Sequence, residues 1–177
     1  KINPSELEKS ITKKTKWIIL NSPSNPTGAC YSEKDIREIA KVLIKHPHVY
    51  ILSDDIYEHV AYAGFKFFTI AQIAELKERV LTMNGVSKAY SMTGWRIGYA
   101  AGPKEIIKAI AKIQSQSTTN PSSISQAAAA EALNGTQDFI KERAISFQER
   151  RDFVVKALND MDGIECLNPD GAFYVFP

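Results

Sequence analysis

Residues 84–102, NGVSKAYSMTGWRIGYAAG, connect and partly form two predicted strands. A short β-prone run at 80–83 precedes this segment and leads into a turn-forming Asn84-Gly85 pair. A second apolar run, interrupted by glycine, occupies residues 97–101. The pattern predicts two buried strands joined by a polar linker.

The linker carries Lys88, the hydroxyl of Ser87 beside it and, eight residues after the lysine, Arg96. A lysine where a sheet edge opens is a candidate for imine formation, and a neighbouring hydroxyl and an arginine are suited to bind phosphate. Taken alone, these residues also fit a structural interpretation. Single lysines are mostly solvated surface charges, and an arginine that follows tryptophan often forms a cation–π contact.

Two further apolar runs, at 17–20 and 49–52, are typical of strands buried on both faces. Between them, residues 31–45 form an amphipathic pattern that Ser32 is suited to cap. A shorter helix is expected at 69–76. This alternation predicts an α/β fold with a mostly parallel sheet and helices on both faces.

Ligands of such sheets bind outside the carboxyl ends of the strands. Asn25, Asp54 and Lys88 each follow a predicted strand, so the topology is expected to bring them together. The alternative interpretations are a rigid strand-to-helix turn for NSPSNPTG at 21–28 and a helix N-cap for Asp54. The Asn25-Pro26 bond is a candidate cis peptide.

The second half of the chain is predicted to be mainly helical. Helices are expected at 103–116 and 125–133, followed by a long helix from Thr136 to about Asp160. The tail is predicted to form two strands, at 164–167 and 171–176, separated by an Asn-Pro turn.

The composition excludes several classes of protein. The chain of 177 residues is 44% hydrophobic and 24% charged, with a net charge of +2 and no basic run, so neither nucleic acid nor a membrane surface is an expected partner. Cys30 and Cys166 are isolated, which favours a reducing cytoplasm. The two histidines around Pro47 have no third ligand nearby in the sequence, so no metal is expected.

Four strings together resemble one family. They are SKxxxMTGWRxGY around Lys88, NxxxNPTG at 21–28, SDDIY at 53–57 and PDGAFYVFP at 169–177. They are similar to motifs of class I aminotransferases, the pyridoxal-phosphate enzymes of the aspartate aminotransferase group. The strings look closest to the bacterial subgroup that acts on aspartate and, in some members, prephenate.

The resemblance implies part of the fold type I large domain, here residues 1–140, followed by a connecting helix and the beginning of a small α+β domain at 141–177. It spans the whole chain but less than half of the family's length. The family's N-terminal glycine-containing loop, its ring-stacking aromatic residue and its arginine for the substrate α-carboxylate have no match in the sequence.

For the lysine segment, the resemblance implies that Lys88 carries pyridoxal 5'-phosphate as a Schiff base and later moves a proton of the substrate. Arg96, with Ser87, is implied to bind the cofactor's phosphate. A guanidinium binds such a group in a bidentate manner, which a lysine does not.

For the other strand ends, the resemblance implies that Asp54 pairs with the pyridine nitrogen and keeps it protonated. Tyr57 and Asn25 are implied to donate to the cofactor's phenolic oxygen, and Asn25 also lies close to the substrate. Asp55 stands where the family has glutamate, which is a departure outside the pairing position.

The implied activity is transfer of an amino group between an amino acid, aspartate or glutamate, and a 2-oxo acid, by a homodimer. Two alternatives use the same cofactor residues. One is a C–S lyase or synthase of the same fold, and the other is a regulator that senses the cofactor without catalysis.

Overall fold

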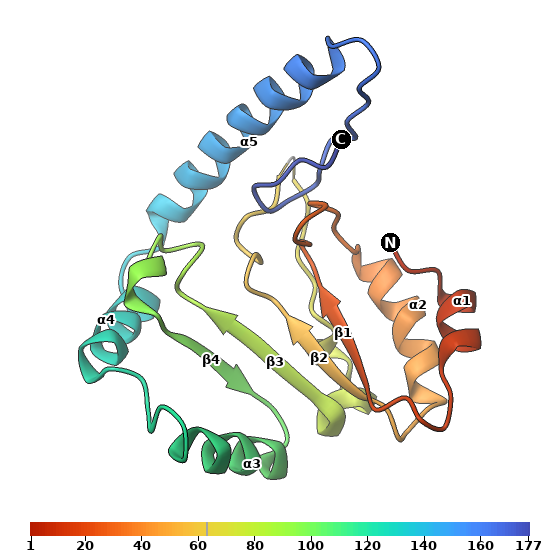
Figure 1. Cartoon of the computed structure of the whole chain (residues 1–177), viewed down its shortest axis with the longest axis vertical. Helices are drawn as coiled ribbons and strands as arrows, with labels where there is room; N and C mark the ends of the chain where they lie inside the picture. Colours follow the sequence, from red (N-terminus) through yellow and green to blue (C-terminus); the bar gives the residue numbers. More distant parts are fainter. Residues whose placement is uncertain (63) are drawn as a thin grey trace.

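The protein folds around one four-stranded sheet with the order β1-β2-β3-β4. The computed structural model describes residues 1–62 and 64–177. The strands are β1 (Trp17–Asn21), β2 (Tyr50–Asp54), β3 (Val80–Gly85) and β4 (Gly98–Ala101). The first three run parallel and β4 is antiparallel to β3, which confirms the mostly parallel sheet (Figure 1).

One face of the sheet is covered by α1 (Pro4–Ser10), α2 (Glu33–Ile44) and the 3-10 helices η1 (Ile70–Gln72) and η2 (Ala74–Arg79). Ser32 and Asp35 form a reciprocal capping box at the start of α2, which confirms the prediction that Ser32 caps this helix. The apolar stripe of α2 then packs on the strands. The core formed there includes Ile36, Ile39, Leu43, Leu20, Ile51 and Val80.

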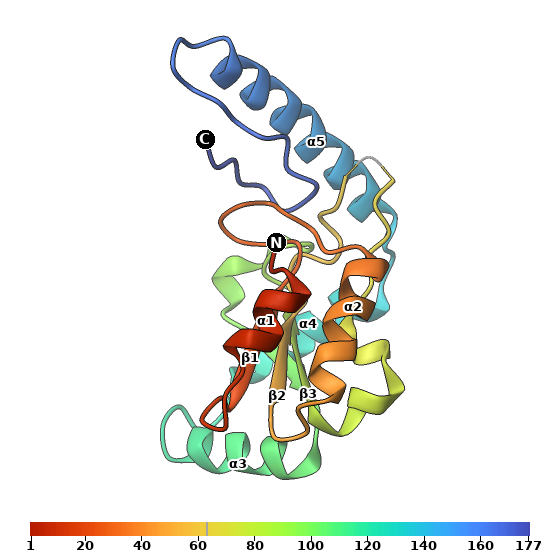
Figure 2. The ribbon, with the colours of Figure 1, turned by 90° about the vertical axis from the view of Figure 1, so that its right-hand side faces the viewer.

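The opposite face of β1 is open, so the prediction that this strand is buried on both faces is wrong. Ile19 is 68% exposed and Trp17 is 41% exposed. A continuous apolar run predicts two covered faces. Within the described part of the chain, however, the helices packed on β1 and β2 lie on one side of the sheet (Figure 2).

The turn predicted at Asn84-Gly85 is also wrong, because both residues belong to β3 and pair with Tyr99 and Gly98 of β4. A Cβ on Gly85 would lie 3.2 Å from the Cα of Gly98. The glycine therefore permits a close approach of two strands rather than a reversal. The helix predicted at 69–76 forms as the two short 3-10 helices η1 and η2.

Three helices follow the sheet: α3 (Lys104–Ser115), α4 (Ser123–Asn134) and α5 (Asp138–Asn159). They lie within about two residues of their predicted bounds. In Figure 1, α5 projects away from the sheet, and the segment after it runs back to the loops above β1 and β2.

The two strands predicted in the tail do not form. Its one ladder contact is an isolated bridge between Ala61 and Gly171. The backbone hydrogen bonds of the tail go instead to two separate loops. Gly28 O accepts from the N–H groups of Asp170 and Gly171, at 3.1 and 3.0 Å, and Ala172 N donates to Val60 O at 2.7 Å. Because its hydrogen bonds are divided between two loops, the tail does not pair with one strand along its length.

Candidate active site

The carboxyl ends of β1, β2 and β3 meet at one edge of the sheet. Asn21, the last residue of β1, donates through Nδ2 to the backbone oxygen of Asp54 at 3.2 Å. Its Oδ1 accepts from Asn25 N at 2.7 Å. Asn21 therefore fixes the loop after β1 to the end of β2. The sequence analysis assigned no role to Asn21, although it is the first asparagine of the NxxxNPTG string.

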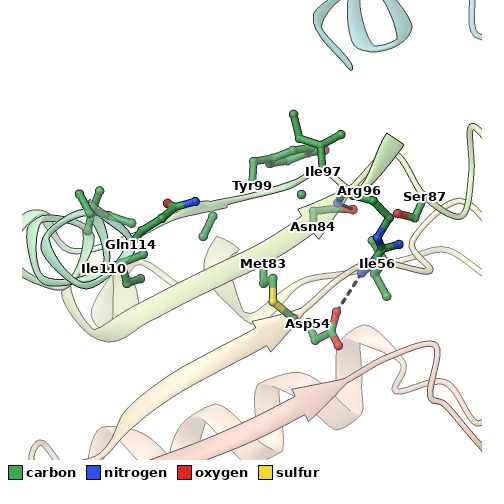
Figure 3. A pocket seen from close by; sticks show the side chains of 15 residues that line it. Asp54, Ile56, Met83, Asn84, Ser87, Arg96, Ile97, Tyr99, Ile110 and Gln114 are labelled. Atoms are coloured by element: carbon green, nitrogen blue, oxygen red, sulfur yellow. Dashed lines mark hydrogen bonds between the residues drawn. The ribbon is translucent and has the colours of Figure 1, made fainter. Parts of the chain in front are cut away.

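A cavity of about 660 Å³ lies beside these strand ends, between β3, β4 and α3. Among its lining residues are Asp54, Ser87 and Arg96, three of the six residues that the sequence singled out (Figure 3). Apolar side chains that include Ile56, Met83 and Ile110 form much of the remaining wall. The cavity thus combines a carboxylate, a hydroxyl and a guanidinium with apolar walls, as small-ligand sites do.

Arg96 directly follows the 3-10 helix η3 (Thr93–Trp95) and has a φ of 51°, in the left-handed region. For a residue with a Cβ this conformation costs about 1–2 kcal/mol. Its Nη1 donates to Thr93 O at 2.9 Å, and no carboxylate of the described residues pairs with the guanidinium. A strained residue with a free positive charge beside a cavity is suited to bind an anion.

Asp54 presents the complementary charge. Its Oδ1 accepts from Ile56 N at 3.3 Å, and none of the ion pairs between described residues involves this carboxylate. Burial raises the pKa of Asp54 above its ordinary value of 3.8. A cationic N–H brought into the cavity would relieve this unfavourable burial of charge.

Arg96 and Asp54 therefore place a free positive and a free negative charge on the same cavity. Pyridoxal 5'-phosphate has the matching pair of groups, an anionic phosphate and a ring nitrogen that carries a positive charge when protonated. The Ser87 hydroxyl adds a hydrogen-bond donor on the cavity wall. The residues present fit this cofactor.

Lys88 and Tyr57 are not among the residues that line this cavity, but each directly follows one that is, Ser87 and Ile56, and the two contact each other. Lys88 Nζ lies 5.6 Å from the ring centre of Tyr57 and 5.4 Å from that of Phe173, which comes from the tail. Tyr57 is buried, and its hydroxyl lies 2.5 Å from that of Tyr174. Burial raises the pKa of Tyr57, so its phenol stays neutral over the physiological range.

Among the described residues, the side chain of Asn25 makes no hydrogen bond to the other predicted site residues. Asn25 is exposed, and its position is set by its backbone N–H, which donates to Asn21 Oδ1. The Asn25-Pro26 bond is cis, as the sequence indicated, and Ser22-Pro23 is cis as well. The loop shape is thus defined without any side-chain contact between Asn25 and Lys88.

Asp55 is a second carboxylate at this edge, but it points into the protein. It is 5% exposed and accepts from Ser53 Oγ at 2.7 Å. Burial raises its pKa above 3.8 in spite of the Ser53 and Thr69 hydroxyls. Asp55 therefore affects the pH dependence of stability, and it does not line the cavity.

We expect the Asp55→Asn substitution to flatten that pH dependence. With its raised pKa, the folded state binds more protons than the unfolded state above about pH 4, so this group lowers the free energy of unfolding as pH rises. The asparagine does not titrate and keeps an acceptor for Ser53. Urea unfolding of both proteins at several pH values checks this: their difference should grow in favour of the variant toward neutral pH, and a constant difference would contradict it.

Two kinds of feature are absent from the described residues. They contain no group of three or more His, Cys, Asp or Glu side chains that could hold a metal ion. No helix among them combines the length and the apolar character that crossing a membrane requires.

The whole chain, residues 1–177, matches the family model described as aminotransferase class I and II. An aspartate aminotransferase from Rhizobium meliloti (strain 1021) is 60% identical to it, over 99% of this chain and 43% of that protein. A probable aspartate/prephenate aminotransferase from Rickettsia prowazekii (strain Madrid E) is 62% identical, over 99% of this chain and 44% of that protein.

The similarity extends to three dimensions. The crystal structure of the aspartate aminotransferase from Rhizobium meliloti superposes with a TM-score of 0.97 at 60% identity, over 99% of this chain and 44% of that one. The chain thus spans less than half the length of these relatives. Its α/β fold with a mostly parallel sheet flanked by helices agrees with the prediction. The chain belongs to the class I and II aminotransferase family.

Proposed function

We propose that the full-length protein transfers an amino group between aspartate or glutamate and a 2-oxo acid. The observation that carries this proposal is the cavity at the strand ends, where Asp54 and Arg96 supply unpaired opposite charges beside Lys88. The names of the relatives support the substrate class: one is an aspartate aminotransferase and another a probable aspartate/prephenate aminotransferase.

Pyridoxal 5'-phosphate is the cofactor of this family. When bound, it supplies an electron sink that stabilises negative charge at the α-carbon of an amino acid. In our proposal Arg96 and Ser87 hold its phosphate, and the Asp54 carboxylate pairs with its protonated ring nitrogen. Removing that cation would leave Asp54 as a half-buried, unpaired charge, so the carboxylate keeps the nitrogen protonated.

Lys88 has two roles in this proposal. Its Nζ would hold the cofactor, and the same nitrogen, when free, would accept the proton from the substrate α-carbon. The rings of Tyr57 and Phe173 beside Nζ keep the ammonium group close to the site. Tyr57 and Asn25 donate to the phenolic oxygen of the cofactor, and Asn25 also contacts the substrate.

We expect Arg96→Lys to weaken binding of pyridoxal 5'-phosphate about tenfold, because a lysine keeps the charge but loses the bidentate geometry. Titration of the cofactor-free protein with pyridoxal 5'-phosphate measures the dissociation constant. Arg37→Lys is the matched control, since Arg37 pairs with Glu33 on the surface of α2. Equal affinities of Arg96→Lys and the wild type would contradict the role of Arg96.

The remaining organisation is part of the same proposal. Residues 1–140 would belong to the cofactor-binding large domain, and residues 141–177 to the connecting helix and the beginning of the small domain. The projection of α5 from the sheet supports this division (Figure 1). We propose a homodimer in the cytoplasm, and the free thiols of Cys30 and Cys166 are compatible with a reducing compartment.

The proposed activity is tested by supplying the full-length protein with aspartate and 2-oxoglutarate and measuring glutamate and ammonia. Transamination predicts one glutamate for each aspartate consumed, without ammonia. Release of ammonia without glutamate would favour a lyase. Binding of the cofactor with neither product, for any amino-acid donor, would favour a regulator.

A further inference from the structure

Tyr174 of the tail reaches the site from 117 residues away in the sequence. Its hydroxyl oxygen lies 2.5 Å from that of Tyr57, and the two rings meet edge to face with centres 5.8 Å apart. Tyr57 is only 2% exposed. The two phenols therefore share a short hydrogen bond that is partly shielded from water.

The position of Tyr174 is set by the backbone before it. The hydroxyl of Tyr62 donates to Ala172 O, and Ala172 N donates to Val60 O at 2.7 Å. At Gly171 a Cβ would lie 2.7 Å from both Pro23 Cγ and Val60 O, so only glycine lets the tail pass this close. These contacts with Tyr62, Val60 and Pro23 hold the tail in one position, with Tyr174 next to Tyr57.

The number of protons leaves two possible directions for this hydrogen bond. Each phenol has one proton and two lone pairs, so one hydroxyl of the pair donates and the other accepts. If Tyr57 donated to Tyr174, no proton of Tyr57 would remain for a ligand. If Tyr174 donates, Tyr57 keeps its proton for the cofactor, and accepting a bond makes its own O–H a stronger donor.

We propose that Tyr174 is a positioning residue that donates to the Tyr57 oxygen and so directs the Tyr57 proton to the phenolic oxygen of the bound cofactor. This role rests on the proposed function, in which Tyr57 donates to that oxygen. Through Tyr57, the tail of the chain influences the basicity of the cofactor's phenolic oxygen without contacting the cofactor.

The first test is the pH dependence of the visible absorbance of the cofactor bound to the full-length protein. A donor on the phenolic oxygen lowers its basicity, so a weaker donor raises the titration midpoint. We expect Tyr174→Phe to raise the midpoint by about 0.5–1 unit, the effect of losing one hydrogen bond. Tyr57→Phe should shift it in the same direction by more.

Tyr50→Phe is the matched control, because Tyr50 begins β2 at the end remote from the site and is exposed. Its midpoint should equal that of the wild type. An unchanged or lowered midpoint in Tyr174→Phe would overturn the positioning role while leaving the proposed function intact. A wild-type protein without visible absorbance would overturn the proposed function and, with it, this role.

The second test needs no cofactor. In the cofactor-free protein, the thermal unfolding midpoints of Tyr57→Phe, Tyr174→Phe and the double variant form a double-mutant cycle. We expect the double variant to unfold no earlier than the less stable single variant, because the first substitution already breaks the bond. Additive shifts would show that the hydroxyls do not interact and would overturn the proposal.

Discussion

Replacing Lys88 by alanine is expected to lower kcat of the full-length protein by at least about 10⁴-fold, because in the proposed site this one side chain supplies both the covalent attachment and the proton transfer. The loss should appear in single-turnover measurements with saturating pyridoxal 5'-phosphate, so that weaker binding does not account for it. The pH profile of the residual rate should no longer depend on this amine.

The fold should survive this substitution. Lys88 is only half-buried, and its contacts are with two aromatic rings, an interaction worth about 0.5–2 kcal/mol. Lys34→Ala is the matched control, because Lys34 is an exposed lysine at the start of α2. If Lys88→Ala unfolded the protein instead of stopping turnover, the lysine would be structural and its assignment as the cofactor lysine would be wrong.

Asp54→Asn is expected to lower kcat/KM by about 10²- to 10³-fold, the cost of removing one member of a buried, hydrogen-bonded charge pair. The amide retains the shape of the side chain and an acceptor for Ile56 N. It does not hold a proton on the ring nitrogen, so the cofactor loses its positive charge and its strength as an electron sink. Steady-state kinetics of the amino-group transfer measure the effect.

Asp55→Asn provides a control one residue away. Asp55 is buried against Ser53 and is absent from the cavity wall, so its substitution should leave kcat/KM within about threefold of the wild-type value. Equal losses in the two variants would mean that the segment as a whole, rather than the charge of Asp54, matters for activity.

The sequence led us to expect Asn25, Asp54 and Lys88 at one edge of the sheet, because parallel strands present their carboxyl ends there. Of these three, Asp54 at the end of β2 lines the cavity, together with Ser87 and Arg96. Local periodicity was also sufficient for α2, whose cap and apolar stripe are encoded within 13 residues.

The predictions were wrong where a local sequence pattern reflects contacts with a distant part of the chain. Gly85 suggested a turn, but it allows β3 and β4 to approach closely, a requirement that appears only once both strands are placed. The tail contains short apolar runs typical of strands, yet its hydrogen bonds go to Gly28 and to the segment around Val60. Neither partner is near in the sequence.

The same limit explains the site residues that were missed. Asn21 bridges the ends of β1 and β2, and Tyr174 contacts Tyr57, which is far from it along the chain. The PDGAFYVFP string was recognised as a motif, but a motif does not reveal which of its side chains turns toward the site. The contacts between distant segments of the folded chain show which side chains these are.

The most direct measurement is to incubate the full-length protein with pyridoxal 5'-phosphate, reduce it with borohydride and locate the modified lysine by mass spectrometry. The proposed site predicts one stable label, on Lys88, which Arg96→Lys weakens and Lys88→Ala abolishes. A label on another lysine, or no label on the wild-type protein, would contradict the central claim that this sheet edge holds the cofactor.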